Sequence, residues 1–348
     1  MEIVDQRRPR SMPVSFFSIA VGSLALANAW RVAERLWHWP HEVSGTISVV
    51  GLLVWGALLV AYARKWATHP TLARAELDDP LQSSFAALVP VSSLLAALTI
   101  QPFAPHTAMA LFIAATIAQL GLGLFLHGRI WKGGRESELI TTAVYLPVVA
   151  PGFVAASAAA AFGWPHVASL FFGAALLSWL AIESMVLHLA TVNRPTPEPR
   201  RPLLGIQIAP PVVGGVAYLN LTGGTPDLIA YAMLGYGIYQ ALLLLRLLPW
   251  IRRQAFAPSY WAFSFGLAAL PTMAMRMAER DATGVVGWLA ISLFVVANGV
   301  IAVLTWKTSM LAARGSLLPP VAVPHAVSAY KPGRERTMPA TISAGRSD

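Results

Sequence analysis

Few side chains inside the apolar parts of this 348-residue chain could carry out acid–base or redox chemistry. Glu183 is a carboxylate within an apolar run, where it could carry a proton or bind a neighbouring helix; we favour the structural role. His127 and His188 lie near the ends of apolar runs, so we do not expect the facing histidine pair that a membrane haem requires. The lack of cysteine excludes thiol, disulfide and iron–sulfur chemistry. Because no Ser/His/Asp set or phosphate-binding loop can be assembled, we expect no enzyme, cofactor or metal site.

The composition is that of a membrane protein with several spans. Apolar residues make up 56% of the chain and charged residues only 12%, against roughly 25% charged residues in soluble proteins. The charges are mostly excluded from runs of about 20 residues, which is the length of a membrane-spanning helix. We predict an all-α integral membrane protein with ten spans, called here spans one to ten in chain order. They lie near residues 14–36, 44–66, 81–100, 105–127, 141–162, 166–190, 203–222, 227–250, 259–280 and 284–312.

The connections between the predicted spans alternate in length and charge. Links after the odd spans are short, whereas links after spans two, four, six and eight are longer and basic. By the positive-inside rule, the basic links and both termini face the cytoplasm, so the chain forms five helical hairpins that point outward. The net charge of +9 therefore reflects topology, and no nucleic-acid partner is expected. Four arginines fall toward the opposite side: Arg31, Arg35, Arg276 and Arg280.

Prolines recur at nearly constant spacing in alternate spans. Pro90, Pro151, Pro210 and Pro271 are separated by 61, 59 and 61 residues, and each lies midway along an odd span. An interior proline removes a helix hydrogen bond and kinks the helix. In a bilayer the freed carbonyl must then bind a neighbouring helix or water in a cavity. Since kinked helices with small residues also approach closely, we expect the odd spans to form an inner ring of five around a pore, with the even spans facing lipid.

The odd spans contain hydroxyl, amide and aromatic side chains but almost no ionisable group. A passage without acidic groups and with basic residues at both ends suits an anion better than a cation. We expect conduction through weak contacts, with an apolar or aromatic constriction as the barrier. Arg276, about one turn from Glu279 and Arg280, is expected at the outer end of this passage.

Several motifs resemble those of the TehA family of tellurite-resistance and dicarboxylate transporters, which also includes the slow-type anion channels of plant guard cells. The resemblance extends from about Pro13 to Leu311 and covers all ten predicted spans. The motifs are Tyr145-Leu146-Pro147, Ser178-Trp179-Leu180-Ala181-Ile182-Glu183, Leu204-Gly205-Ile206-Gln207-Ile208-Ala209-Pro210, Leu245-Arg246-Leu247-Leu248-Pro249-Trp250 and Trp261-Ala262-Phe263-Ser264-Phe265-Gly266.

This resemblance implies a homotrimer in which each protomer has its own pore inside five inner helices. It also implies that a phenylalanine of span nine plugs the pore; the matching residue is Phe265, with Phe263 as the second choice. The family's first span commonly reads Phe-Gly-Ile, but this chain has Phe17-Ser18-Ile19, so a hydroxyl replaces a glycine that faces the pore. The residues expected to line the pore are Ser18, Gly22, Phe85, Pro90, Tyr145, Pro151, Gln207, Pro210 and Pro271.

The sequence therefore predicts a gated channel or channel-like uniporter for small inorganic or organic anions, located in a bacterial inner membrane. The resemblance further implies an association with tellurite resistance. A proton-coupled carrier of dicarboxylates or oxyanions is the alternative, and a Glu183 carboxylate facing the passage would favour it. A non-transporting scaffold or sensor would instead have an inner ring without a passage. The predicted segments are a cytoplasmic N-terminus at 1–12, a ten-helix channel domain at 13–313 and a disordered cytoplasmic tail at 314–348.

Overall fold

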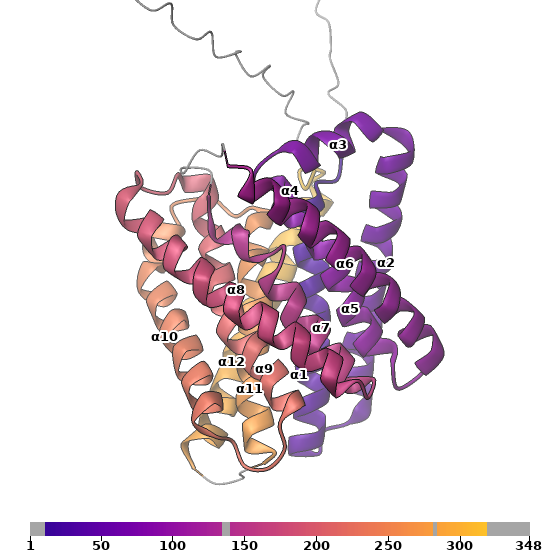
Figure 1. Ribbon diagram of the computed structural model, residues 1–348, viewed down its shortest axis with the longest axis vertical. Coiled ribbons are helices and arrows are strands. Elements are labelled where there is room, and N and C mark those ends of the chain that lie inside the picture. Colours follow the sequence, from indigo (N-terminus) through magenta and orange to yellow (C-terminus); the bar gives the residue numbers. More distant parts are fainter. Residues whose placement is uncertain (1–10, 134–139, 281–283, 319–348) are drawn as a thin grey trace, which may run out of the picture.

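The computed structural model describes residues 11–133, 140–280 and 284–318, which form helices joined by short turns (Figure 1). Within these ranges no strand is present, so the predicted all-α class is confirmed. Most of the predicted N-terminal segment 1–12 and of the predicted tail 314–348 lies outside the described residues.

The long helices of the described ranges form five helical hairpins, each with an inner helix followed by an outer helix. The hairpins are α1 (Phe17–Trp37) with α2 (His41–Thr68), α5 (Leu88–Ile100) with α6 (Pro105–Trp131), α7 (Val149–Ala161) with α8 (Pro165–Val192), α9 (Ala209–Leu221) with α10 (Leu228–Ile251), and α11 (Ser264–Ala278) with α12 (Val285–Ala313). Shorter helical segments precede the inner helices: η1 (Val14–Phe16), α3 (Pro70–Asp78), α4 (Gln82–Phe85), η3 (Thr142–Tyr145), η4 (Glu198–Ile208) and η5 (Pro258–Phe263).

Nine segments of the described chain are long and apolar enough to cross a membrane. They correspond to predicted spans one to eight and span ten; the segment η5–α11, at the position of span nine, is not among them, so the count of ten stays a prediction. We compared the most apolar 18-residue stretch of each segment. In the inner segments ending with α1, α5, α7 and α9, 61–89% of these residues are buried, against 17–33% in the outer helices. A helix that is apolar all round yet exposed must face lipid, so the outer helices form the lipid-facing layer.

The inner helices contact one another in a closed ring. Helix α1 packs against α5 and α11, α7 packs against α5 and α9, and α9 packs against α11. Each outer helix packs mainly against the inner helix of its own hairpin. The inner layer of odd spans expected from the sequence is therefore present as a ring of helices.

The prolines do not act as predicted. We expected each to kink a continuous helix at its middle, but Pro90, Pro151 and Pro210 stand in the first turn of α5, α7 and α9. Turn residues precede α5 and α7, and the 3-10 segment η4 leads directly into α9. First-turn N–H groups have no partner within the helix, so proline loses no hydrogen bond there and its fixed φ suits the helix start. Only Pro271 lies inside its helix, α11. The repeat therefore marks the start of three inner α-helices, and the kink interpretation was wrong for those three.

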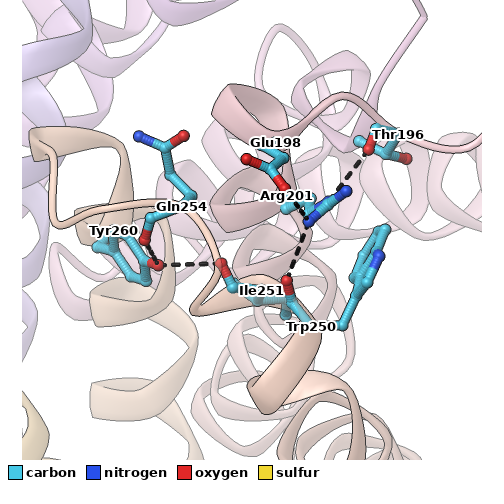
Figure 2. A network of polar contacts seen from close by, with 7 residues as sticks. All are labelled: Thr196, Glu198, Arg201, Trp250, Ile251, Gln254 and Tyr260. Atoms are coloured by element: carbon cyan, nitrogen blue, oxygen red, sulfur yellow. Dashed lines mark hydrogen bonds and ion pairs between the residues drawn. The ribbon is translucent and has the colours of Figure 1, made fainter.

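One end of the bundle, called here the basic end, contains the starts of the inner helices and the ends of the outer helices. Figure 2 shows a polar network there that joins η4 to the end of α10. The Arg201 guanidinium donates to the Trp250 carbonyl at 3.2 Å, pairs with Glu198 at 3.1 Å, and lies 4.3 Å from the Trp250 ring centroid. The Tyr260 hydroxyl of η5 donates to the Gln254 carbonyl at 2.8 Å. These contacts fix the fourth and fifth hairpins relative to each other.

Candidate functional site

A central cavity of about 380 Å³ lies inside the ring and is lined by residues of all five inner helices. Most lining side chains are small or apolar, such as Ala25 and Val213. The polar and charged lining residues are Asn28, Arg31, Arg35, Gln101, Ser157, Asn220, Thr272 and Arg276. A cavity with contributions from every inner helix makes this the candidate functional site.

The lining residues follow one face of each inner helix. On α11 they are Phe265, Ala269, Thr272 and Arg276, at intervals of three or four residues. Eleven residues separate Phe265 from Arg276, a rise of about 16 Å along the helix. Phe265 stands in the first turn of α11, so it forms the part of this face nearest the basic end. Arg276 stands in the last turn, at the opposite end of the bundle, called here the arginine end.

The backbone on either side of Phe265 is held tightly. A Cβ atom added at Gly22 of α1 would lie 2.5 Å from Cβ of Ser264, and one added at Gly266 would lie 2.7 Å from Cβ of Ile208. Ser264 and Gly266 are buried in these contacts, whereas Phe265 between them stays partly exposed. The backbone at Phe265 is thus fixed by its two neighbours, while its side chain lines the central cavity and packs against apolar residues beside it.

The charge around the central cavity is positive. Three arginines line it, and no acidic residue of the described chain does. Arg35 is 3.2 Å from the Glu279 carboxylate, and Arg31 donates to the Leu98 carbonyl at 3.1 Å. The Arg276 Nε is buried and has no hydrogen-bond partner among the described residues. The cavity can therefore attract an anion and offers it a guanidinium with free donors.

The other residues predicted for the gate and the pore lie elsewhere in the ring. Phe263 packs against Gly205, since a Cβ atom added there would lie 2.5 Å from Cγ of Phe263. The Ser18 hydroxyl donates to the Ser15 carbonyl at 2.8 Å, while Tyr145 and Gln207 belong to the network described next. The remaining predicted residues are buried but are not among those lining the central cavity: Gly22, Phe85, Pro90, Pro151, Pro210 and Pro271. A place for these residues on a conduction path stays a prediction.

A second polar centre surrounds Glu183 of α8, between the third and fourth hairpins. Its carboxylate is buried and does not line the central cavity. It accepts hydrogen bonds from Tyr145 at 2.6 Å, Trp179 at 3.1 Å, Gln207 at 2.7 Å, Tyr236 at 2.6 Å and Gln240 at 3.4 Å. Because these donors come from η3, α8, η4 and α10, Glu183 joins four segments. This agrees with the structural role that we favoured for Glu183.

Tyr236 and Gln240 were not identified from the sequence, and Tyr145 and Gln207 were placed on the pore instead of beside Glu183. A usable signal was present, because Trp179 and Glu183 are four residues apart, as are Tyr236 and Gln240. In a helix this spacing places both side chains on one face. Two outer helices thus carry paired polar residues that need a partner within the bundle.

We predict that Glu183→Gln lowers the stability of the folded chain by about 2 kcal/mol or more, because the new amide NH₂ faces donors and cannot accept from them. Thermal unfolding of the protein in detergent measures this loss. Glu42→Gln is the matched control, since Glu42 is exposed on the first turn of α2. An unchanged melting temperature for Glu183→Gln, equal to that of the control, would contradict the structural role of the network.

We also predict that Gly22→Ala destabilises the ring by about 1–3 kcal/mol, because the added methyl group forces α1 away from α11. Gly56→Ala on α2 is the matched control, because a Cβ atom there meets nothing within 4 Å. Alanine at Gly56 should leave stability unchanged or raise it slightly, since alanine favours the helix. Equal melting temperatures for the two variants would show that α1 and α11 are not in close contact.

Comparison with known proteins gives consistent matches over nearly the whole chain. The family model described as SLAC1, voltage-dependent anion channel, matches residues 11–309. A protein of Haemophilus influenzae named tellurite resistance protein TehA homolog is 33% identical over 302 residues, which cover 86% of this chain and 91% of that protein. A Methanocaldococcus jannaschii protein named as an uncharacterized transporter is 22% identical, over 73% of this chain and 81% of its own length. A second such protein from the same organism is 23% identical, over 66% of this chain and 72% of its own length.

Proposed function

Since this chain belongs to the SLAC1/TehA family of anion channels and transporters, we propose that it is a gated anion channel, or channel-like uniporter, with Phe265 as its gate. The central cavity is the outer part of the passage. The Phe265 ring closes it toward the basic end, and the small anion crosses when the ring rotates away.

The observation that carries this proposal is the composition of the central cavity. All five inner helices line it, three arginines stand toward one end, and Phe265 stands at the other. Arginines in a cavity with apolar walls raise the local concentration of anions. An aromatic ring across a narrow passage is an apolar barrier, which a change of rotamer relieves. Together these features attract anions and control their passage.

The distribution of basic residues between the two ends of the bundle indicates how the protein is oriented in the membrane. We propose that the basic end faces the cytoplasm, together with both termini, and that the arginine end faces outward from a bacterial inner membrane. The lipid-facing layer supports a multi-pass arrangement, because large apolar residues such as Leu53 and Val60 are exposed on it. Anions from outside would then enter the central cavity directly.

We also propose a homotrimer with one passage per protomer, as the family resemblance implies. Its mass in detergent, measured by light scattering, tests this assembly. The name of the Haemophilus influenzae relative refers to tellurite resistance, and we propose the same association for this chain. An oxyanion such as tellurite belongs to the chemical class that a positive cavity attracts.

A proton-coupled carrier needs a titratable group that meets the passage. No carboxylate among the described residues lines the central cavity, and the Glu183 carboxylate is turned to five hydrogen-bond donors. The geometry therefore favours the channel over the carrier.

We predict that Phe265→Ala raises the anion current by roughly tenfold or more, which corresponds to removing about 1.4 kcal/mol of barrier. The measurement is current across a bilayer that contains purified protein, with chloride and nitrate gradients. The reversal potential should follow the anion gradient.

Phe125→Ala is the matched control for this measurement, because it removes a ring of the same size that is exposed on outer helix α6 and does not line the cavity. It should leave the current near the wild-type level. Folded Phe265→Ala protein with wild-type current would refute the gate. Silence from both variants, together with pH-dependent uptake of labelled dicarboxylate into vesicles, would favour the carrier.

A further inference from the structure

The arginine end of the central cavity contains hydrogen-bond donors that nothing in the described chain uses. Arg276 makes no hydrogen bond or ion pair to a described residue, and its Nε is buried. Ser157 of α7 and Asn220 of α9 line the same cavity, and their side chains make no hydrogen bond within the described ranges. Buried polar groups in folded proteins are normally satisfied. Of these three side chains, only Arg276 has a buried unpaired donor, while Ser157 and Asn220 add donors that border the cavity, so together they have the donors of a binding site.

The neighbouring polar side chains are different, because each already donates one hydrogen bond to a carbonyl of the protein. The Asn28 amide donates to the Leu24 carbonyl at 3.1 Å, and the Thr272 hydroxyl donates to the Ala268 carbonyl at 2.7 Å. The Gln101 amide donates to the Ala161 carbonyl at 2.8 Å. The side chains that donate no bond to the protein are thus Ser157, Asn220 and Arg276, on α7, α9 and α11, and Arg31 of α1 keeps further N–H groups beside its bond to Leu98.

The charge at this place selects an anion. Arg31 and Arg276 line the cavity and form no ion pair within 4 Å in the described chain, whereas Arg35 is paired with Glu279. Glu34 near Arg31 and Glu279 near Arg276 act on them only at longer range, so the three arginines keep the lining positive. A guanidinium presents two parallel N–H groups, which match two oxygens of one ligand. A halide is a single atom, so it cannot place two separate acceptor atoms opposite these two N–H groups. The donor set therefore favours an oxyanion over chloride.

We propose that Arg276, with Arg31, Ser157 and Asn220, forms a binding site for small oxyanions such as nitrate, sulfate or a carboxylate. The site lies inside the ring of inner helices, which the outer helices separate from lipid, so its ligand enters from water. Arg276 stands about 16 Å along α11 from Phe265. The oxyanion binds there before it passes the Phe265 side chain. This role on the anion path rests on the proposed function, whereas the binding itself does not.

The test is binding to the full chain in detergent, with Phe265 intact. Sodium nitrate and sodium sulfate are titrated in a background of constant ionic strength, and the rise in melting temperature gives the dissociation constant. Sodium chloride is the comparison ligand. We expect Arg276→Gln to weaken nitrate and sulfate binding roughly ten- to a hundredfold, because a charge-assisted hydrogen-bonded pair is lost.

Arg253→Gln is the matched control, since it removes the same charge from an exposed position at the basic end. It should leave binding unchanged. Arg276→Lys keeps the positive charge but removes the two parallel N–H groups of the guanidinium, so it should reduce the preference for nitrate over chloride. If Arg276→Gln does not fold, Arg31→Gln tests the same site and should also weaken binding.

Equal oxyanion affinity in wild type, Arg276→Gln and Arg31→Gln would overturn this site. So would a wild-type protein that binds chloride as tightly as nitrate and sulfate. These outcomes leave the proposed function intact if Phe265→Ala still raises the anion current. Conversely, oxyanion binding that depends on Arg276 in a protein without any current would support the site and refute the channel.

Discussion

The close approach of the inner helices is the constraint on which the rest of the structure depends. Within a bilayer, helix association relies on small residues that let backbones meet, since lipid is as apolar as the side chains. Gly22 meets Ser264 and Gly266 meets Ile208 at distances that no larger residue permits. Five inner helices meet around one axis, and many of the residues on their inner faces are small, such as Ala25, Ser157 and Ala269, so a cavity remains in the centre. The same contacts hold the backbone beside Phe265, which leaves its side chain as the element able to move.

The sequence predicted the layers of this fold well. Alternation of short neutral links with long basic links predicts hairpins, and the hairpins fix which helices lie inside. The proline repeat pointed to the correct helices for a different reason from the one we assigned, because Pro90, Pro151 and Pro210 begin α-helices instead of bending them. Hydropathy cannot separate these two cases, since both place a proline within an apolar run.

The rotation of each inner helix about its axis could not be predicted. Helices α5, α7 and α9 are apolar almost all round, so their sequences have little periodic signal for the face that meets the cavity. In α1 a signal was present, because Asn28, Arg31 and Arg35 recur at intervals of three or four residues. Tyr145 and Gln207 were expected to face the passage, but the Tyr145 hydroxyl and the Gln207 amide nitrogen donate to Glu183, which only a three-dimensional arrangement can show. Phe265 was identified through family resemblance, and the intervals to Thr272 and Arg276 show the face that it shares.

The central claim is that the face of α11 bearing Phe265 and Thr272 borders the anion path. The chain lacks cysteine, so single cysteines can be introduced without removing others. The most direct measurement is the current through a Phe265→Ala variant that also carries Thr272→Cys, before and after an impermeant sulfonate thiol reagent is added at the arginine end. We predict that modification blocks the current, whereas Met273→Cys, whose side chain packs against Gly215, leaves it unchanged. Complete modification of Thr272→Cys with an unaltered current would contradict the account.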